Sequence, residues 1–104
     1  MIHQILSKSF EKFEYIDFEP PQTLVGRAKD RLNLIFGESP SDSSMRALMK
    51  KSRDGFEGMM QIRSAVGTFV ADVIGEDPHE VVDSLASKIR SQLRSWKAQR
   101  QLTN

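Results

Sequence analysis

The stretch GEDPHEVVDSLASKIRSQLRSWKAQR, residues 75–100, predicts a long amphipathic helix with a well-marked start. Asp77 is placed as the N-cap, Pro78 falls at the first helical position, and Glu80 completes a capping-box pattern. Apolar residues then recur at spacings of three and four, which stacks them on one helical face: Val82, Leu85, Ile89, Leu93 and Trp96. We therefore expect one side of this helix to be buried in the core.

Three short strands are predicted directly before this helix. Residues 45–52 (MRALMKKS) precede Asp54-Gly55, a strong tight-turn signal, and residues 58–64 (GMMQIRS) are separated from residues 68–74 (TFVADVI) by a second turn. In the last segment the apolar residues alternate, as they do in a strand with one face against helices. The three segments therefore predict two consecutive hairpins.

The N-terminal part of the chain adds a strand and a second helix. Residues 12–18 (KFEYIDF) alternate and predict a strand, which the two prolines that follow bring to an end. Apolar residues then repeat at spacings of four, four and three, at Leu24, Ala28, Leu32 and Ile35. This pattern predicts a helix over residues 21–36 that stops at Gly37.

These elements predict an α+β fold in the order β-α-β-β-β-α, with two helices packed on one face of a four-stranded sheet. We expect residues 12–104 to form a single domain, preceded by a short N-terminal arm at residues 1–11. No run approaches the roughly 18 apolar residues of a membrane span. The N-terminus carries no cleavable secretory signal, so we expect a cytoplasmic protein.

The net charge is only +1, but the charges are segregated along the chain. From Ser84 to the C-terminus there are five basic residues and no acidic ones: Lys88, Arg90, Arg94, Lys97 and Arg100. At about 100° per residue, Arg90, Arg94 and Lys97 cluster on one flank of the helix, while Lys88 lies on the opposite flank. Acidic residues gather near the other end of the chain, at Glu11, Glu14, Asp17 and Glu19.

The basic helix flanks indicate a surface for phosphate groups. Arg27 and Arg31 share a flank of the first predicted helix, and they line a common surface with the C-terminal cations if both helices cover one face of the sheet. The alternative is a solvated face whose cations complement the helix dipole. The absence of acidic partners at i±4 favours phosphate binding. The basic residues of the second predicted strand and its turn either enlarge this surface or point elsewhere: Arg46, Lys50, Lys51 and Arg53.

No catalytic or metal-binding pattern accompanies the basic residues. The two histidines, His3 and His79, have no ligand partners at metal-binding spacing, and the chain has no cysteine. It also has no phosphate-loop motif and no nucleophile elbow. We therefore expect a protein that is not an enzyme and that uses no metal, cofactor or small-molecule substrate. Trp96 continues the apolar spacing, so we expect it to pack in the core rather than to stack on a base.

The order of residues over 67–100 is specific. A glycine turn and a strand lead into a helix, with these pairs and triplets in sequence: Gly75-Glu76-Asp77, Asp83, Lys88-Ile89, Gln92-Leu93-Arg94 and Trp96-Lys97. This order resembles, without a gap, the end of the bacterial ribosome hibernation-promoting factors, also called ribosome-associated inhibitors. The resemblance implies the same β-α-β-β-β-α fold, which is related to double-stranded-RNA-binding domains.

The resemblance also implies a function. A member of this family binds in the decoding channel of the small ribosomal subunit, contacts ribosomal RNA phosphates with basic residues of both helices, and represses translation in stress or stationary phase. Carried onto matching positions, the RNA-binding residues are Lys88, Arg94 and Lys97, with Arg27 and Arg31 on the first helix. Arg90 stands where members often carry an acid, and it extends the basic stripe.

The resemblance implies a monomer when free, with ribosomal RNA as partner and no membrane contact. Two alternatives remain open from the sequence. The first is a protein–protein interaction module of the same fold, and the second is a general binder of structured RNA. Phosphate binding fades steeply with ionic strength, whereas an apolar interface does not, so the salt response separates the first alternative from RNA binding.

Overall fold

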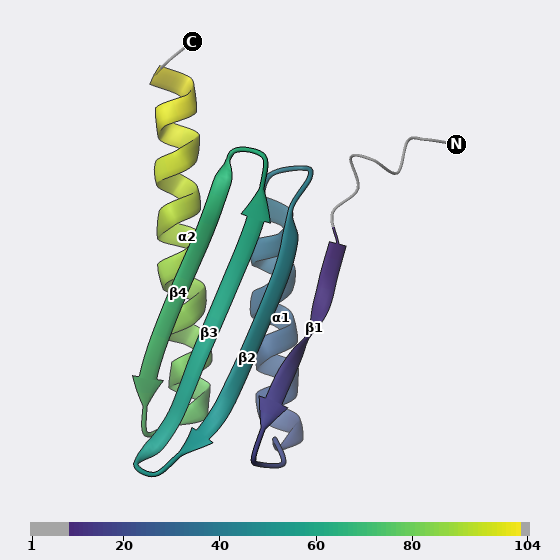
Figure 1. Cartoon of the computed structure of the whole chain (residues 1–104), viewed down its shortest axis with the longest axis vertical. Helices are drawn as coiled ribbons and strands as arrows, with labels where there is room; N and C mark the ends of the chain where they lie inside the picture. The colour runs from purple at the N-terminus through teal and green to yellow at the C-terminus, as the bar shows by residue number, and fades with distance from the viewer. Residues whose placement is uncertain (1–8, 103–104) are drawn as a thin grey trace, which may run out of the picture.

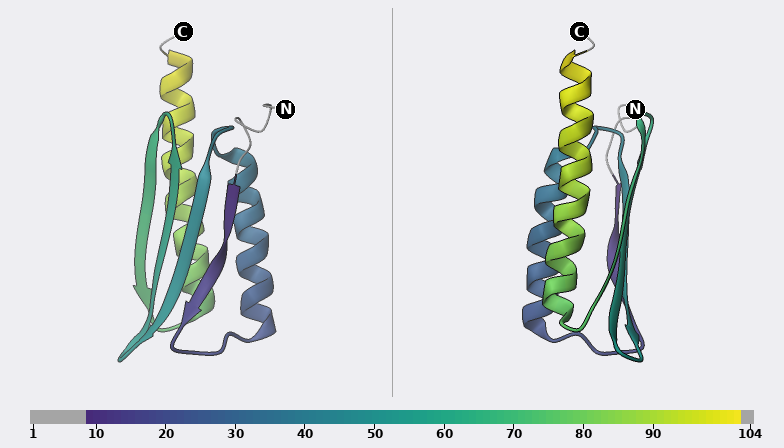
Figure 2. Two further views of the ribbon diagram at one scale, coloured as in Figure 1. Left: turned by 45° about the vertical axis from the view of Figure 1, so that its right-hand side comes forward. Right: turned by 90° about the vertical axis from the view of Figure 1, so that its left-hand side faces the viewer.

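A computed structural model describes residues 9–102, which form a four-stranded sheet with two helices on one face (Figures 1 and 2). This confirms the predicted α+β class and the predicted order of elements. The elements are β1 (Ser9–Ile16), α1 (Gln22–Glu38), β2 (Ser44–Ser52), β3 (Gly55–Ser64), β4 (Gly67–Gly75) and α2 (Pro78–Leu102).

The strands lie in the order β1-β2-β3-β4, so neighbours in sequence are neighbours in the sheet. The β2–β3 and β3–β4 pairs are antiparallel hairpins, whereas β1 is parallel to β2 because α1 carries the chain back to the same end of the sheet. Both helices therefore start at the same end, and α2 continues past the sheet at its C-terminal end (Figure 1). Of the C-terminal cations, Lys88 lies beside β4, and Arg90 and Arg94 precede Trp96, which still packs against Phe69 of β4, so only the last turns of the helix project.

Strand β1 differs from the prediction at both ends. It begins at Ser9, so residues 9–11 belong to the strand, while the rest of the expected arm, residues 1–8, lies outside the described residues. It ends at Ile16 because Asp17 adopts a φ of 66°, a left-handed conformation that no strand accommodates.

The prediction that α1 stops at Gly37 is wrong. The helix continues to Glu38, and Ser39 closes it: the Ser39 backbone N–H and Oγ both donate to the carbonyl of Phe36, at 3.4 and 2.8 Å. Gly37 has no positive φ and therefore does not form a glycine C-cap. The two additional residues matter because they bring Glu38 to the surface shared with α2.

The start of α2 follows the prediction in part. The Asp77 carboxylate accepts a hydrogen bond from the backbone N–H of His79 at 2.9 Å, and this bond lowers the pKa of Asp77. Pro78 is the first helical residue. Within residues 9–102, no hydrogen bond returns from the Glu80 side chain, so the N-cap forms without the reciprocal half of the capping box.

The core lies between the helices and the sheet. The apolar stripe of α2 is buried as predicted from Val82 to Leu93, with Leu85 and Ile89 at 0% exposure, whereas Trp96 is partly buried. Gly58 of β3 lets α2 approach closely, because a Cβ there would come within 2.7 Å of both Leu85 and Val81. Three methionines fill the same layer, as expected for strand positions: Met45, Met49 and Met60.

Candidate nucleic-acid interface

Polar side chains join α1 to α2 along one line, which we call the inter-helix seam. At its start, Thr23 Oγ1 lies 3.2 Å from His79 Nε2. One turn further, Asp83 accepts hydrogen bonds from two arginines of α1: Arg27 Nη1 donates to Oδ2 at 3.1 Å, and Arg31 Nε donates to Oδ1 at 3.0 Å. Asp83 therefore holds both arginines in fixed positions while their side chains stay 43% and 39% exposed.

The other end of the seam is built around Glu38. Arg90 binds this carboxylate with two hydrogen bonds, Nε to Oε1 at 3.0 Å and Nη2 to Oε2 at 3.2 Å. The hydrogen bond from Arg90 lowers the pKa of Glu38, and the charges of Lys97 and Arg94 lower it further. Arg94 and Lys97 thus lie near the same carboxylate, but within the described part of the chain neither forms a salt bridge of its own.

The seam is positively charged even after its ion pairs are counted. Two carboxylates, Asp83 and Glu38, face five cations, which leaves three positive charges uncompensated. The structure thus brings together five of the residues predicted to bind RNA: Arg27, Arg31, Arg90, Arg94 and Lys97. A surface of this kind suits the phosphate backbone of a nucleic acid, because arginine that is already ion-paired keeps unused N–H donors.

Lys88 lies apart from the seam. It sits on the opposite flank of α2, where it lines a shallow hollow beside Val70 and Asp72 of β4. The sixth predicted RNA-binding residue therefore belongs to a different surface from the other five.

Trp96 packs as expected from its spacing. Its ring contacts Phe69 of β4 edge-on, with centroids 6.2 Å apart, and it lies against the hydrophobic core. The Arg100 guanidinium lies over the same ring, 5.0 Å from its centroid. The predicted packing of Trp96 against the core is confirmed.

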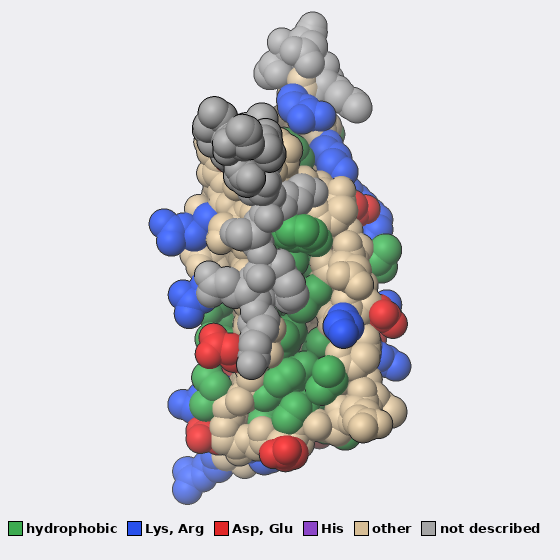
Figure 3. Space-filling view, turned by 90° about the vertical axis from the view of Figure 1, so that its right-hand side faces the viewer, with side chains coloured by type: hydrophobic (Ala, Val, Ile, Leu, Met, Phe, Trp, Pro, Cys, Tyr) green, Lys and Arg blue, Asp and Glu red, His purple; other side chains and the backbone are tan. Residues whose placement is uncertain are grey.

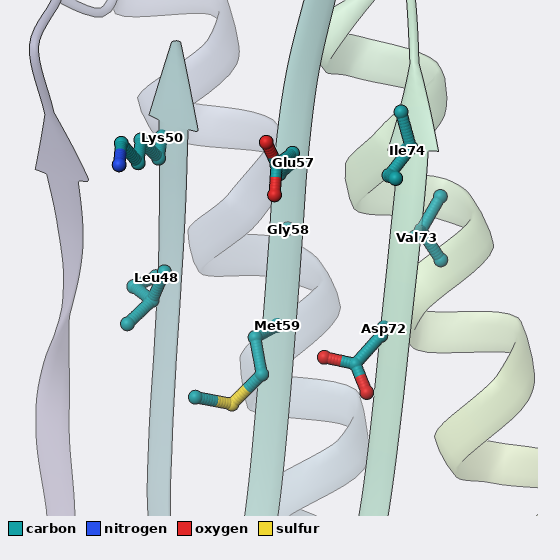
Figure 4. Close-up of a pocket in the computed structure, with 8 residues that line it drawn as sticks. All are labelled: Leu48, Lys50, Glu57, Gly58, Met59, Asp72, Val73 and Ile74. Carbon is teal, nitrogen blue, oxygen red and sulfur yellow. The ribbon is translucent and has the colours of Figure 1, made fainter. Parts of the chain in front are cut away.

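The outer face of the sheet has a different character. A shallow hollow there mixes apolar and charged side chains, as Figure 4 shows. It is lined on this face by Leu48, Lys50, Glu57, Met59, Asp72 and Ile74. One cation faces two carboxylates in this hollow, so the hollow itself does not attract phosphate. The exposed cations Arg46 and Lys50 of β2 alternate with buried Ala47 and Met49, so they lie on this outer face and do not enlarge the seam.

Sequence reasoning missed the two carboxylates of the seam. Their partners are 52 to 56 residues away in the sequence, on the other helix, so a search at i±4 does not detect them. It also missed the role of Gln92, whose side chain binds both backbone groups of Val70. Its Nε2 donates to the Val70 carbonyl at 2.7 Å, and its Oε1 accepts from the Val70 N–H at 3.1 Å. Gln92 therefore ties α2 to the free edge of β4.

Within residues 9–102, no group of three or more histidine, cysteine, aspartate or glutamate side chains is placed to hold a metal ion. None of the helices in the same range is long and apolar enough to cross a membrane.

Two solved structures share this arrangement of a β1-β2-β3-β4 sheet covered by two helices on one face. The N-terminal domain of Thermus thermophilus Protein Y matches with a TM-score of 0.70 and 9% identity, over 85% of this chain and 98% of that domain. A ribosomal subunit interface protein from Coxiella burnetii matches with a TM-score of 0.71 and 18% identity, over 86% of this chain and 98% of that one. No protein-family model and no curated protein sequence matches the chain.

The chain therefore has the fold of the Protein Y N-terminal domain and of the ribosomal subunit interface protein. This confirms the fold that the resemblance of residues 67–100 implied. At identities of 9% and 18%, the likeness establishes the fold, and the function is argued from the seam.

Replacing Glu38 with glutamine should lower the free energy of unfolding at pH 7. The unfolding free energy of the variant should also decrease less than that of wild type as the pH is lowered. Because the folded pKa lies below the ordinary value of 4.5, the ionised carboxylate stabilises the folded state above that pH. This contribution is lost as the pH falls through the folded pKa, and glutamine has no such contribution to lose. Urea unfolding should give a gap between wild type and Glu38→Gln at pH 7 that narrows by pH 3. A gap independent of pH would contradict a stabilising Arg90–Glu38 pair.

Proposed function

We propose that this chain is a non-catalytic RNA-binding protein of the ribosome, and that the inter-helix seam contacts ribosomal RNA phosphates. The observation that carries the proposal is the excess of positive charge on the seam, where three cations remain after Asp83 and Glu38 are paired. The excess lies on the C-terminal half of α2, where Arg94 and Lys97 flank the pair formed by Arg90 and Glu38.

The cations of the seam contribute to phosphate binding in different ways. Arg94 and Lys97 have no salt bridge to break within the described residues, so they supply the strongest attraction for phosphate. Arg27 and Arg31 share one carboxylate, which fixes their side chains and leaves guanidinium N–H groups for a second acceptor. Arg90 is committed to Glu38 by two hydrogen bonds and contributes mainly by holding α1 against α2. Lys88, on the opposite flank, provides a separate contact where RNA wraps around the helix.

The proposed target is the small ribosomal subunit, and the proposed mechanism is occlusion of its decoding region. Two observations support this choice: the ungapped resemblance of residues 67–100 to the hibernation-promoting factors, and a fold shared with a ribosomal subunit interface protein. RNA of this kind is recognised by shape and backbone rather than by base edges, so a set of fixed arginines and lysines is sufficient. A monomer in this position in the cytoplasm would exclude messenger and transfer RNA and lower translation under stress.

Co-sedimentation with purified small ribosomal subunits across a salt series tests this proposal. The association constant should fall by about 0.7–0.9 of a decade per decade of salt for each phosphate contacted. Three uncompensated cations then predict a log–log slope of about −2 to −3. Binding that does not respond to salt would point to the protein-interaction alternative, and equal affinity for an isolated RNA duplex would point to a general RNA binder.

A further inference from the structure

The two edges of the sheet are protected differently. At the β4 edge, Gln92 occupies both the N–H and the carbonyl of Val70, so a further strand cannot pair there without displacing it. At the β1 edge, the only pairing partner among residues 9–102 is β2 on its inner side. An unprotected edge strand presents a row of free backbone donors and acceptors to another strand.

An apolar groove lies directly beside the β1 edge. It runs between β1 and α1, has a volume of about 330 Å³, and is lined almost entirely by apolar groups. Its walls include Phe13, Tyr15, Pro20, Val25, Lys29 and Leu32. Figure 3 shows hydrophobic side chains gathered on this side of the molecule. Val25 is 40% exposed in a helix whose buried residues lie further round, so part of this apolar surface faces water.

The alternation of β1 defines what an added strand would meet. Phe13 and Tyr15 line the groove on the helix side, whereas Glu14 and Ile16 are exposed on the outer face of the sheet. These four residues pair in regular register with residues 47–50 of β2, after a register shift between Phe10 and Phe13. An added strand would place every second side chain in the groove and the others beside Glu14.

The charges along the β1 edge indicate which kind of strand could bind there. Glu14, Asp17 and Glu19 are exposed along this edge, against two cations, Lys29 in the groove and Lys50 of β2, which pairs with Ile16, so carboxylates are in excess. A second copy of the chain would bring two sets of these carboxylates together, and a nucleic acid would be repelled by them. A strand with cationic residues beside the carboxylates and apolar residues in the groove meets neither difficulty.

We propose that the β1 edge and its groove bind an extended segment of a partner protein in which basic and apolar residues alternate. The segment adds a fifth strand to the sheet, with backbone hydrogen bonds to β1, apolar side chains against Tyr15 and Val25, and basic side chains near Glu14. This surface lies on the opposite side of α1 from the inter-helix seam, so both can be occupied at once. It also accounts for the acidic residues near the start of the chain, which the RNA-binding proposal does not use.

The test is fluorescence anisotropy of a labelled heptapeptide, Lys-Val-Lys-Val-Lys-Val-Lys, titrated with the full chain. Val25→Lys, which fills the groove with a cation, should weaken binding at least tenfold. Leu34→Lys is the matched control, because Leu34 is 51% exposed on the same helix and does not line the groove, and it should leave binding within twofold. Circular dichroism melting confirms that both variants fold.

Two modified peptides make the test independent of the variants. N–H groups of alternate residues in a strand point to opposite sides, so an added strand uses either its lysine or its valine N–H groups toward β1. Methylating the nitrogens of one set should abolish binding, and methylating the other set should leave it within threefold. The proposal is overturned if the unmodified peptide does not bind, if both methylated peptides bind equally, or if Val25→Lys binds as wild type does. None of these outcomes bears on ribosome binding, which is measured separately.

Discussion

Reversing Arg94 and Lys97 to glutamate is expected to weaken binding to the small ribosomal subunit about 100-fold at moderate salt. Hydrogen bonds to charged groups contribute about 1.5–3 kcal/mol each, and two lost phosphate contacts therefore remove about 3 kcal/mol or more. Both residues are free of salt bridges within the described residues, so the fold loses no ion pair when they are changed. Sedimentation with purified subunits measures the loss, and the salt dependence of the remaining binding should become shallower.

Lys29 and Arg53 offer a control with the same change in total charge. Lys29 lies on the groove side of α1, and Arg53 lies exposed in the turn between β2 and β3, so neither belongs to the seam. The double variant Lys29→Glu/Arg53→Glu should bind the subunit within a few-fold of wild type. Equal losses in the two double variants would mean that total charge, and not the seam, governs binding. Arg90 is left unchanged in both, because a glutamate there would face Glu38 directly.

The fold was predictable from the sequence because its strongest signals are local. An N-cap at Asp77, apolar spacings of three and four, and two tight turns each specify a short segment without reference to the rest of the chain. The end of α1 was not predictable in this way. Glycine is typical of helix C-termini, which is why the sequence predicts that α1 ends at Gly37, but the hydrogen bonds of Ser39 decide where the helix ends.

The candidate interface was predictable in its cations but not in its charge balance. The stripe on α2 follows from helical geometry alone. The pairing of Arg90 with Glu38, 52 residues away in the sequence, depends on the parallel packing of the two helices. The same packing gives Asp83 two arginine partners. A reading confined to one helix therefore overstates the free charge of Arg27, Arg31 and Arg90. It does place Lys88 on the opposite flank of α2, and the structure has Lys88 on that flank.

Gly55→Ala should be among the most destabilising single-methyl additions to this chain, with a cost of about 3 kcal/mol and a melting temperature lower by about 10–20 °C. Gly55 opens β3 with a φ of +157° and lies buried against the end of β4. A Cβ there would collide with the carbonyl oxygen of Gly75 and come within 3.2 Å of the Glu76 Cα. Both obstacles are backbone, so no side-chain rotation relieves them.

Gly67→Ala separates this contact from backbone strain. Gly67 has a similar φ of +139° at the turn between β3 and β4, but a Cβ there meets nothing within 4 Å. Its cost should be limited to the strain of an unfavourable φ, about 1 kcal/mol. Thermal and urea unfolding of both variants should therefore rank Gly55→Ala well below Gly67→Ala. Gly75 and Glu76 lead directly into the N-cap of α2. If both variants lost the same unfolding free energy, the backbone at this end of the sheet would be able to move away from the added methyl group without disturbing the helix that carries the seam.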